Sequence, residues 1–378
     1  MNILISHLTL LIFNVITVSG AGKLTPAENA KRLEMCGKVE EPKVFRGRPA
    51  SALEAPWAVY LHVAGPRGTG ACTATLISPR HLSCSTHCVY AFELLEEFWT
   101  ETNSLGHKFD KSQCDKHGSI VIPERFTQNL SLIDGSIMEK WRIETEMEKF
   151  AHGIKTDSLV APFSKSRTRR TEVLIGKVKS LTLFGFCRKA TENYIEQYPD
   201  DFMIIELAKD VVITPRLYPA CVARDTLESA PGTVLEYYGY GMNPAEPNQN
   251  TSFPRLRHES VTILDANEGG TIRGIDPRFF KARSVSEKTV ACPGDSGGGA
   301  LRKIDGRYTV VGVISRTTCA FGLREETASE WYATIGFYDS LICEYTGICN
   351  PPRRSSRTNF DSIAFAMLFL FLFLLLVQ

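Results

Sequence analysis

The sequence predicts an all-β protein built from short antiparallel strands. Short runs rich in β-branched and aromatic residues, each bounded by turn residues, recur along the chain, whereas long helical patterns are few. The clearest runs are residues 57–63, 73–79, 171–186, 201–207, 233–241, 258–264, 297–303 and 308–315. Many short strands of this kind are typical of β-barrels and β-sandwiches.

Composition and charge indicate a globular protein without an electrostatic site for nucleic acid. The chain has 378 residues, 43% of them hydrophobic, which is enough for one large core or two smaller ones. Its 43 Lys and Arg residues balance 42 Asp and Glu residues, so we expect no nucleic-acid partner. The basic cluster at residues 164–170 is expected to be a solvated loop, with a heparin-like or processing site as the alternative. We see no internal repeat, metal site or cofactor motif.

Both ends of the chain are apolar and are expected to lie outside the folded domain. Residues 1–20 combine an apolar stretch with small residues, as in a secretory signal; a buried strand or helix is the alternative. Residues 363–377 form a second apolar run, shorter than the roughly 20 residues of a usual spanning helix. The polar stretch before this run favours a glycolipid-anchor signal, and a plain membrane span is a close alternative.

Cysteines and glycosylation sequons predict an oxidising compartment. All eleven cysteines follow residue 20, and their odd number leaves at least one unpaired. Sequons begin at Asn129 and Asn250, and both asparagines would need to lie on the surface. We therefore expect a protein that is secreted or held at the extracellular face of the plasma membrane.

Residues from about 91 to 170 differ from the rest of the chain because they are charged and mixed in character. Within them, residues 134–153 have a helix-like composition. We interpret the whole stretch as a large charged insertion on the β core.

The segment ACPGDSGGGA, residues 291–300, holds Ser296 in a glycine-rich turn. Its glycines let the backbone curl tightly, which would aim the Ser296 hydroxyl and two N–H groups at one point. Such a segment is often only a turn. A serine hydroxyl is a weak nucleophile until a base takes its proton, so a catalytic interpretation requires a histidine and a group that orients it.

His87 and Asp201 are the candidates for these two roles. His87 lies at the end of an apolar strand beside Cys88, and a disulfide from Cys88 to Cys72 would fix the histidine there. Asp201 opens the apolar run DFMIIEL. A carboxylate at the start of a buried strand needs a partner, and an imidazole N–H is a natural one.

These motifs resemble those of the chymotrypsin/trypsin family of serine proteases, from about Cys36 to about Cys349. The nucleophile motif is CPGDSGGG with Ser296, the histidine motif is STHC with His87, and Asp201 lies between them in the family's order. The resemblance implies two packed antiparallel β-barrels and a short C-terminal helix. It also implies a serine endopeptidase acting on proteins or peptides, with an activating protease and protein inhibitors as partners, and with no cofactor.

The resemblance assigns a role to each residue of the site. His87 would take the proton of Ser296 and return it to the leaving group, while Asp201 would orient the imidazole and stabilise its charged form. The N–H groups of Gly294 and Ser296 would form the oxyanion hole. Ser315 matches the serine that hydrogen-bonds the aspartate.

The resemblance further implies disulfides and an activation step. The implied pairs are Cys292–Cys319 beside the active site and Cys36–Cys221 between propeptide and domain, in addition to Cys72–Cys88. The other cysteines have no implied pairing, and a Cys114–Cys187 bond is a guess; they are Cys84, Cys114, Cys187, Cys343 and Cys349.

Cleavage after Lys43 would free the Val44 ammonium to pair with Asp295. The implied domains are a signal at 1–20, a propeptide at 21–43, a peptidase domain at 44–350 and a linker with an apolar tail at 351–378. This order of segments is that of a zymogen.

Substrate preference depends on Val290, Thr317 and Glu330, which the resemblance places with Ser315 around the primary pocket. Val290 stands where trypsin-type members have aspartate, which with Thr317 favours a narrowed apolar pocket for small or medium side chains. If Glu330 points inward, it would supply a negative charge that favours Lys or Arg. Alternatively, Glu330 points to solvent.

Two functions from different classes follow from these observations. The intact His87, Asp201 and Ser296 favour an active endopeptidase. The departures from the family pattern favour a protease-like module that binds without cleaving. These departures are the polar residues before His87 (Cys84, Ser85 and Thr86), the changed pocket rim (Arg316 and Thr317) and the long spacing from His87 to Asp201.

Overall fold

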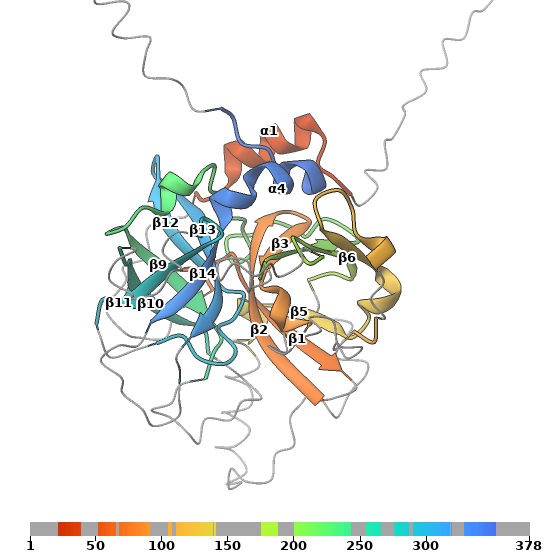
Figure 1. Ribbon diagram of the computed structural model, residues 1–378, viewed down its shortest axis with the longest axis horizontal. Helices are drawn as coiled ribbons and strands as arrows, with labels where there is room; N and C mark the ends of the chain where they lie inside the picture. Colours follow the sequence, from red (N-terminus) through yellow and green to blue (C-terminus); the bar gives the residue numbers. More distant parts are fainter. Residues whose placement is uncertain are drawn as a thin grey trace, which may run out of the picture.

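The computed structural model of the chain contains two β-sheets that lie side by side (Figure 1). Two helices, α1 (Pro26–Met35) and α4 (Asp339–Thr346), pack together along one end of the pair. The structure describes residues 22–38, 52–65, 68–90, 105–107, 111–138, 140, 175–187, 200–242, 255–265, 276–286, 290–317, 319 and 329–352. The expected short C-terminal helix is therefore present as α4.

The first sheet is an open, antiparallel half-barrel in the order β4-β6-β7-β3-β2-β1-β5. Its strands are β1 (Ala58–Gly65), β2 (Gly68–Ser78), β3 (His81–Cys84), β4 (Ile120–Pro123), β5 (Leu130–Asp134), β6 (Val178–Leu183) and β7 (Met203–Leu207). Among the described residues, no ladder joins its two edges, β4 and β5. The prediction of a closed barrel is therefore wrong for this half.

The second sheet closes into a barrel. Its strands are β8 (Cys221–Val222), β9 (Val234–Gly239), β10 (Arg257–Ile263), β11 (Phe279–Ser284), β12 (Gly299–Ile304), β13 (Arg307–Thr317) and β14 (Glu330–Thr334). The order is β12-β9-β10-β11-β14-β13-β8, and a further pairing of β12 with β13 closes six of these strands. β8 joins the outer side of β13 in parallel.

The stretch interpreted as an insertion contributes two strands to the first sheet. β5 pairs with β1, and β4 pairs with β6, although both lie between residues 91 and 170. The Cys114–Cys187 disulfide ties the chain before β4 to the chain after β6. The insertion therefore does not run unbroken over that range. β4 and β5 were missed because each is short and flanked by polar residues.

Residues 22–38 are docked on both sheets. Thr25 and Glu28 form a capping box that begins α1, since each side chain accepts a hydrogen bond from the other residue's backbone N–H. Leu24 N–H donates to Thr346 O of α4, at 2.7 Å. On the first sheet, Arg80 pairs with Glu28. On the second, the Cys36–Cys221 disulfide holds the end of the segment. Residues 22–38 of the expected propeptide thus contact both sheets.

Aromatic side chains fill the junction of the two sheets. Trp57, just before β1, packs edge-on to Tyr238 of β9 and tilted against Tyr308 of β13. On the side that faces α4, Phe184 stacks on Phe202, and both rings contact Tyr338. These contacts fix the two sheets relative to each other, and so fix the loops that meet between them.

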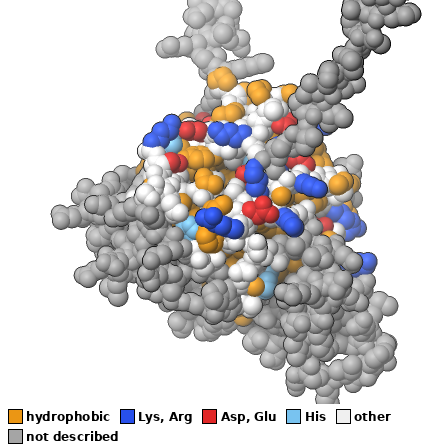
Figure 2. Space-filling view, turned by 90° about the vertical axis from the view of Figure 1, so that its right-hand side faces the viewer, with side chains coloured by type: hydrophobic (Ala, Val, Ile, Leu, Met, Phe, Trp, Pro, Cys, Tyr) orange, Lys and Arg blue, Asp and Glu red, His pale blue; other side chains and the backbone are white. Residues whose placement is uncertain are grey.

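The outer face of the first sheet carries mixed charges. Figure 2 shows Lys and Arg side chains interspersed with Asp, Glu and apolar side chains on this face, in keeping with the formal net charge of +1. Among the described residues, no helix has both the length and the apolar character needed to cross a bilayer. The signal at 1–20 and the tail from residue 353 lie outside the described residues.

Candidate active site

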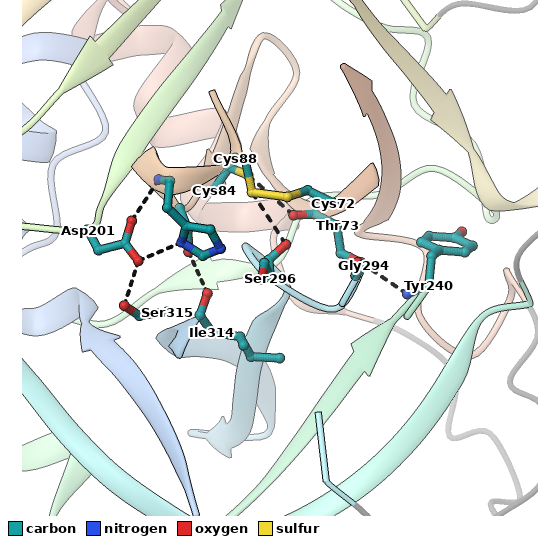
Figure 3. Close-up of a disulfide and its surroundings, with 12 residues drawn as sticks. Cys72, Thr73, Cys84, Cys88, Asp201, Tyr240, Gly294, Ser296, Ile314 and Ser315 are labelled. Atoms are coloured by element: carbon teal, nitrogen blue, oxygen red, sulfur yellow. Dashed lines mark hydrogen bonds and ion pairs between the residues drawn. A yellow bond between two sulfur atoms is a disulfide. The ribbon is translucent and has the colours of Figure 1, made fainter. Parts of the chain in front are cut away.

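The candidate site lies where the two sheets meet. β3 and β7 are antiparallel neighbours, with Cys84 opposite Met203. His87 follows β3 on the 3₁₀ helix Thr86–Cys88, and Asp201 lies two residues before the start of β7, so both residues reach the same end of the sheet. Ser296 comes from the second sheet, just before β12. Figure 3 shows Asp201, Ser315, Gly294 and Ser296 gathered beside the Cys72–Cys88 disulfide.

His87 is held by the carboxyl group of Asp201 at two points. The His87 backbone N–H donates to Asp201 Oδ1 at 2.9 Å, and the ring Nδ1 lies 2.8 Å from Asp201 Oδ2. With the proton on Nδ1, the neutral imidazole keeps a free lone pair on Nε2. The Asp201 side chain is buried, whereas the His87 side chain is 28% exposed. The carboxyl group of Asp201 thus orients the imidazole ring of His87, and part of the His87 side chain remains exposed.

The pKa of Asp201 is kept low in spite of its burial. Burial alone raises the pKa of a carboxyl because it disfavours the charged form. The charge of His87, its hydrogen bonds and the hydroxyl of Ser315, which donates to Asp201 Oδ2 at 2.5 Å, outweigh this effect. The result is a pKa below the usual aspartate range, so Asp201 stays ionised at neutral pH.

The turn that carries Ser296 is fixed to both sheets. Thr73 N–H of β2 donates to Ser296 O at 2.9 Å, and Gly297 N–H donates to Ile314 O of β13 at the same distance. Gly297 has φ +82°, and a Cβ there would lie 2.4 Å from both Cys84 Sγ and Thr73 O. Only glycine fits at this position, so the expected glycine-rich turn has a steric cause.

Two backbone amides of this turn are fixed in direction and remain without a described acceptor. Met242 N–H donates to Pro293 O. The Pro293 C=O and the Gly294 N–H belong to one trans peptide and point in opposite directions, so this bond also fixes the direction of the Gly294 N–H. Gly298 N–H donates to Asp295 O and sets the direction of the Ser296 N–H likewise. Neither N–H donates to any residue that the structure describes. Buried amides are normally paired, so this pair suits an incoming oxygen.

Asp295 is buried beside this turn and accepts two backbone hydrogen bonds. Gly241 N–H donates to Oδ1 at 2.8 Å, and Cys292 N–H donates to Oδ2 at 2.9 Å. Burial raises the pKa of Asp295 to about 6. A Cβ on Gly241 would lie 2.1 Å from the carboxyl, which explains the glycine of the GYG segment. Lys43 and Val44 lie outside the described residues.

A comparison with known protein families decides the identity of the fold. The model of the nematode trypsin-6-like family matches residues 5–149 and 159–349. This chain belongs to that family. The resemblance to trypsin-like serine proteases drawn from the motifs is thereby confirmed.

Two individual proteins are similar to this member of the nematode trypsin-6-like family. Serine protease Hayan of Drosophila melanogaster is 26% identical over 156 residues, which are 37% of this chain and 24% of Hayan, so the match spans about a quarter of that relative. The crystal structure of the scabies mite inactivated protease paralogue S-I1 is 18% identical. That match covers 79% of this chain and 97% of the mite chain, with a TM-score of 0.47.

In this family member, two of the three residues before His87, Ser85 and Cys84, have side-chain partners, in β13 and β2. Ser85 Oγ donates to Ile314 O at 2.5 Å, the same carbonyl that accepts from Gly297. The Cys84 thiol is buried and donates to Thr73 O at 3.3 Å. The sequence analysis did not single out Thr73 or Ile314, because their contacts depend on strands that are distant in the chain.

The residues expected around the substrate pocket fall on two neighbouring strands and the segment before Ser296. Thr317 ends β13, Glu330 begins β14, and Val290 precedes the Cys292–Cys319 disulfide. Glu330 is 1% exposed, so the alternative in which it points to solvent is wrong. Its orientation could not be predicted, because the sequence alone does not fix where the strand after Cys319 begins.

The cysteines form five disulfides. They are Cys36–Cys221, Cys72–Cys88, Cys114–Cys187, Cys292–Cys319 and Cys343–Cys349, with Cys84 free. Disulfides in this number are typical of proteins from an oxidising, extracellular compartment. Asn129 is exposed in the turn before β5, whereas Asn250 lies outside the described residues.

Proposed function

We propose that this protein is a serine endopeptidase that cleaves peptide bonds through an acyl-enzyme formed on Ser296. The observation that carries the proposal is the His87–Asp201 pair, in which two hydrogen bonds hold the histidine. This arrangement leaves Nε2 to act as a base on the side of the ring away from the carboxyl. The amides of Gly294 and Ser296, which have no acceptor among the described residues, support it, because they offer donors for a developing oxyanion.

The proposed reaction has two halves that use the same groups. His87 Nε2 takes the proton of the Ser296 hydroxyl as Oγ bonds to the carbonyl carbon, and the carbonyl electron pair moves onto the oxygen. Collapse of this intermediate expels the amine, which receives the proton from Nε2. Water then repeats the sequence on the acyl-enzyme. Each oxyanion donor contributes about 2.7–4 kcal/mol to the stabilisation of the transition state.

Activation by cleavage after Lys43 is part of the proposal. The buried Asp295 carboxyl, with a raised pKa, is a favourable partner for an ammonium group, and the new Val44 N-terminus would supply one. The proposed location is the cell exterior, with the tail from residue 353 as an anchor. Its partners are protein or peptide substrates, the activating protease and protein inhibitors.

A protease-like binding module is the second candidate. It is favoured by the positions of Thr317 and Glu330, whose side chains turn into the expected substrate pocket rather than away from it. A module of this kind would keep the fold and bind a protein without hydrolysing it.

A fluorophosphonate probe separates the two candidates. We expect the secreted, processed protein to contain a chain that begins at Val44 and to be labelled at Ser296, and Ser296→Ala to abolish labelling and peptide hydrolysis. His87→Ala should lower kcat by about 10⁶-fold, because the triad acts as a unit. The matched control Ser286→Ala removes an exposed hydroxyl and should change neither. Folded wild-type protein that contains the chain beginning at Val44 and is not labelled would favour the binding module.

A further inference from the structure

The expected substrate pocket has three walls, and two of them are adjacent strands. Thr317 of β13 and Glu330 of β14 are direct partners in the strand register. The third wall is the segment that runs through Val290 and Ala291 to the Cys292–Cys319 disulfide. For a substrate side chain to enter between these walls, they must stand apart.

Thr317 and Glu330 both reach across to the same residue of the third wall. Thr317 Oγ1 donates to Ala291 O at 2.5 Å, and Glu330 Oε1 accepts from Ala291 N–H at 2.5 Å. Tyr332 OH donates to the other oxygen of Glu330. Both polar groups of Ala291 are therefore occupied by side chains from the opposite walls, and Ala291 itself is fully buried.

The two hydrogen bonds close the gap between the walls at the level of Ala291. A group held between two walls needs carbon contacts of about 3.5–4.0 Å on each side, hence walls roughly 7–8 Å apart. The polar atoms that meet at Ala291 are separated by a single hydrogen-bond length. To admit a ring or a long chain, the protein would have to break these bonds and leave buried polar groups unpaired, which is unfavourable.

We propose that Thr317 and Glu330 seal the primary substrate pocket and limit cleavage to bonds that follow glycine, alanine or serine. This inference rests on the proposed function and names its substrate class. It places specificity in two side chains that fill the pocket from its walls, rather than in the residue at its floor, Val290.

Glu330 acts in this arrangement as a plug and not as a receptor for a cationic side chain. Its two oxygens already accept hydrogen bonds from Ala291 and Tyr332. Burial, together with the nearby carboxyls of Asp295 and Glu259, raises the pKa of Glu330 to about 7. The group therefore carries less than its full negative charge at neutral pH, which weakens any attraction for Lys or Arg.

The seal is tested first by cleavage of a peptide library with the processed enzyme. We expect hydrolysis after alanine to exceed that after phenylalanine or arginine by about tenfold or more, since steric exclusion from a pocket has effects of this size. The double variant Thr317→Gly/Glu330→Gly should raise cleavage after phenylalanine relative to alanine by a similar factor. A wild-type enzyme that favours phenylalanine, lysine or arginine overturns the proposal.

Two matched variants separate the seal from charge and from general damage. Glu330→Gln keeps the volume of the plug and an acceptor for Ala291 N–H, so the library profile should stay that of the wild type. A profile that changes with Glu330→Gln contradicts the plug and supports a charge role. Thr262→Gly removes a threonine from β10, which lies apart from the pocket walls in the sheet order, and should leave the profile unchanged.

A binding measurement tests the seal without any need for turnover. Indole and benzamidine are small apolar and cationic probes of such a pocket, and calorimetry should detect no saturable binding of either to the wild type. Binding of indole should appear in the double variant, or in Thr317→Gly alone if the double variant is not folded by circular dichroism. Binding of either probe to the wild type overturns the seal. Loss of fluorophosphonate labelling, by contrast, counts against the proposed function and leaves this test intact.

Discussion

Asp201, which binds His87, and Asp295, which precedes Ser296 in the chain, are both buried, yet their pKa values shift in opposite directions. The pKa of Asp201 is lowered, because His87 and Ser315 provide a charge and side-chain donors that outweigh its burial. The pKa of Asp295 is raised to about 6, because its donors are two backbone amides, which compensate burial less well. Burial disfavours the ionised form of both carboxyl groups, and their hydrogen-bonding and charged partners determine whether the ionised or the protonated form predominates.

The two halves of the site therefore differ in whether their buried carboxyl group already has a charged partner. The half built on the first sheet holds an ionised carboxylate against its histidine. The half built on the second sheet holds a carboxyl that gains most from an added cation, which is the role proposed for the Val44 ammonium. Glu330, in the same barrel, shows the same upward shift of its pKa.

Arg278 is the position where we expect the largest effect on stability, because it supplies a buried cation to Asp200, the neighbour of Asp201 in the chain. Arg278 Nη1 lies 2.8 Å from Asp200 Oδ1, and Nη2 lies 2.7 Å from Asp276 Oδ2. Arg278→Met would leave both carboxyls buried without this guanidinium. We expect the free energy of unfolding at pH 7 to fall by about 3–5 kcal/mol, as measured by urea denaturation.

The triple variant Arg278→Met, Asp200→Asn and Asp276→Asn is the matched control for this prediction. It removes the two charges that the single variant strands, so it should recover a large part of the lost stability. Equal losses in the single and triple variants would show that Arg278 acts through packing rather than charge.

Asp295 gives a second, smaller effect that depends on pH in the uncleaved protein. Below a pH of about 4, the carboxyl is protonated in both the folded and the unfolded chain and contributes nothing. As the pH rises towards about 6, the unfolded chain ionises while the folded chain stays protonated, so stability falls. The full penalty, about 3 kcal/mol, is present above that pH.

Urea denaturation of the uncleaved protein between pH 4 and pH 7 measures this slope. Asp295→Asn should reduce it, leaving the contribution of Glu330, whereas Asp305→Asn, at an exposed turn, should not change it. Cleavage before Val44 should also reduce it if the ammonium pairs with Asp295. A slope unchanged by Asp295→Asn would place the titrating group elsewhere.

The parts of the site that the sequence predicted are those carried by local motifs. The three candidate catalytic residues each lie next to a strand that the hydrophobic pattern predicts clearly. The sequence therefore predicted the strands that carry His87, Asp201 and Ser296, and the order of these residues in the chain. The helix α1 was not predicted, although Thr25 and Glu28 form a capping box at its start.

The parts that could not be predicted depend on contacts between distant segments. Glu330 meets Ala291 39 residues earlier in the chain, and its direction follows from the register of β13 with β14. β4 and β5 are too short to stand out from charged surroundings, and they gain their order from β6 and β1. Closure of the second barrel alone is likewise a property of strand pairing and not of any single segment.

Ser315 gives the smallest expected loss of stability, but it tests the comparison of Asp201 with Asp295 most directly. Its hydroxyl donates to Asp201, and no described side chain donates to Asp295 in the same way. Ser315→Ala removes the 2.5 Å bond to Asp201 Oδ2 and leaves the two contacts with His87. The pKa of Asp201 should rise towards its unfolded value. We expect the free energy of unfolding at pH 7 to fall by about 1.5 kcal/mol, the lower end for a bond to a charged group.

The sign of this effect with pH distinguishes it from a packing defect. A carboxyl with a lowered pKa stabilises the folded state above its unfolded pKa, and that contribution disappears as the pH falls through the folded value. The difference between Ser315→Ala and the wild type should therefore be full at pH 7 and shrink towards zero as the solution is acidified. Ser340→Ala, at an exposed position of α4, should differ from the wild type by an amount that does not change with pH. A loss for Ser315→Ala that is equal at all pH values would mean that its hydroxyl supports the strand and not the charge of Asp201.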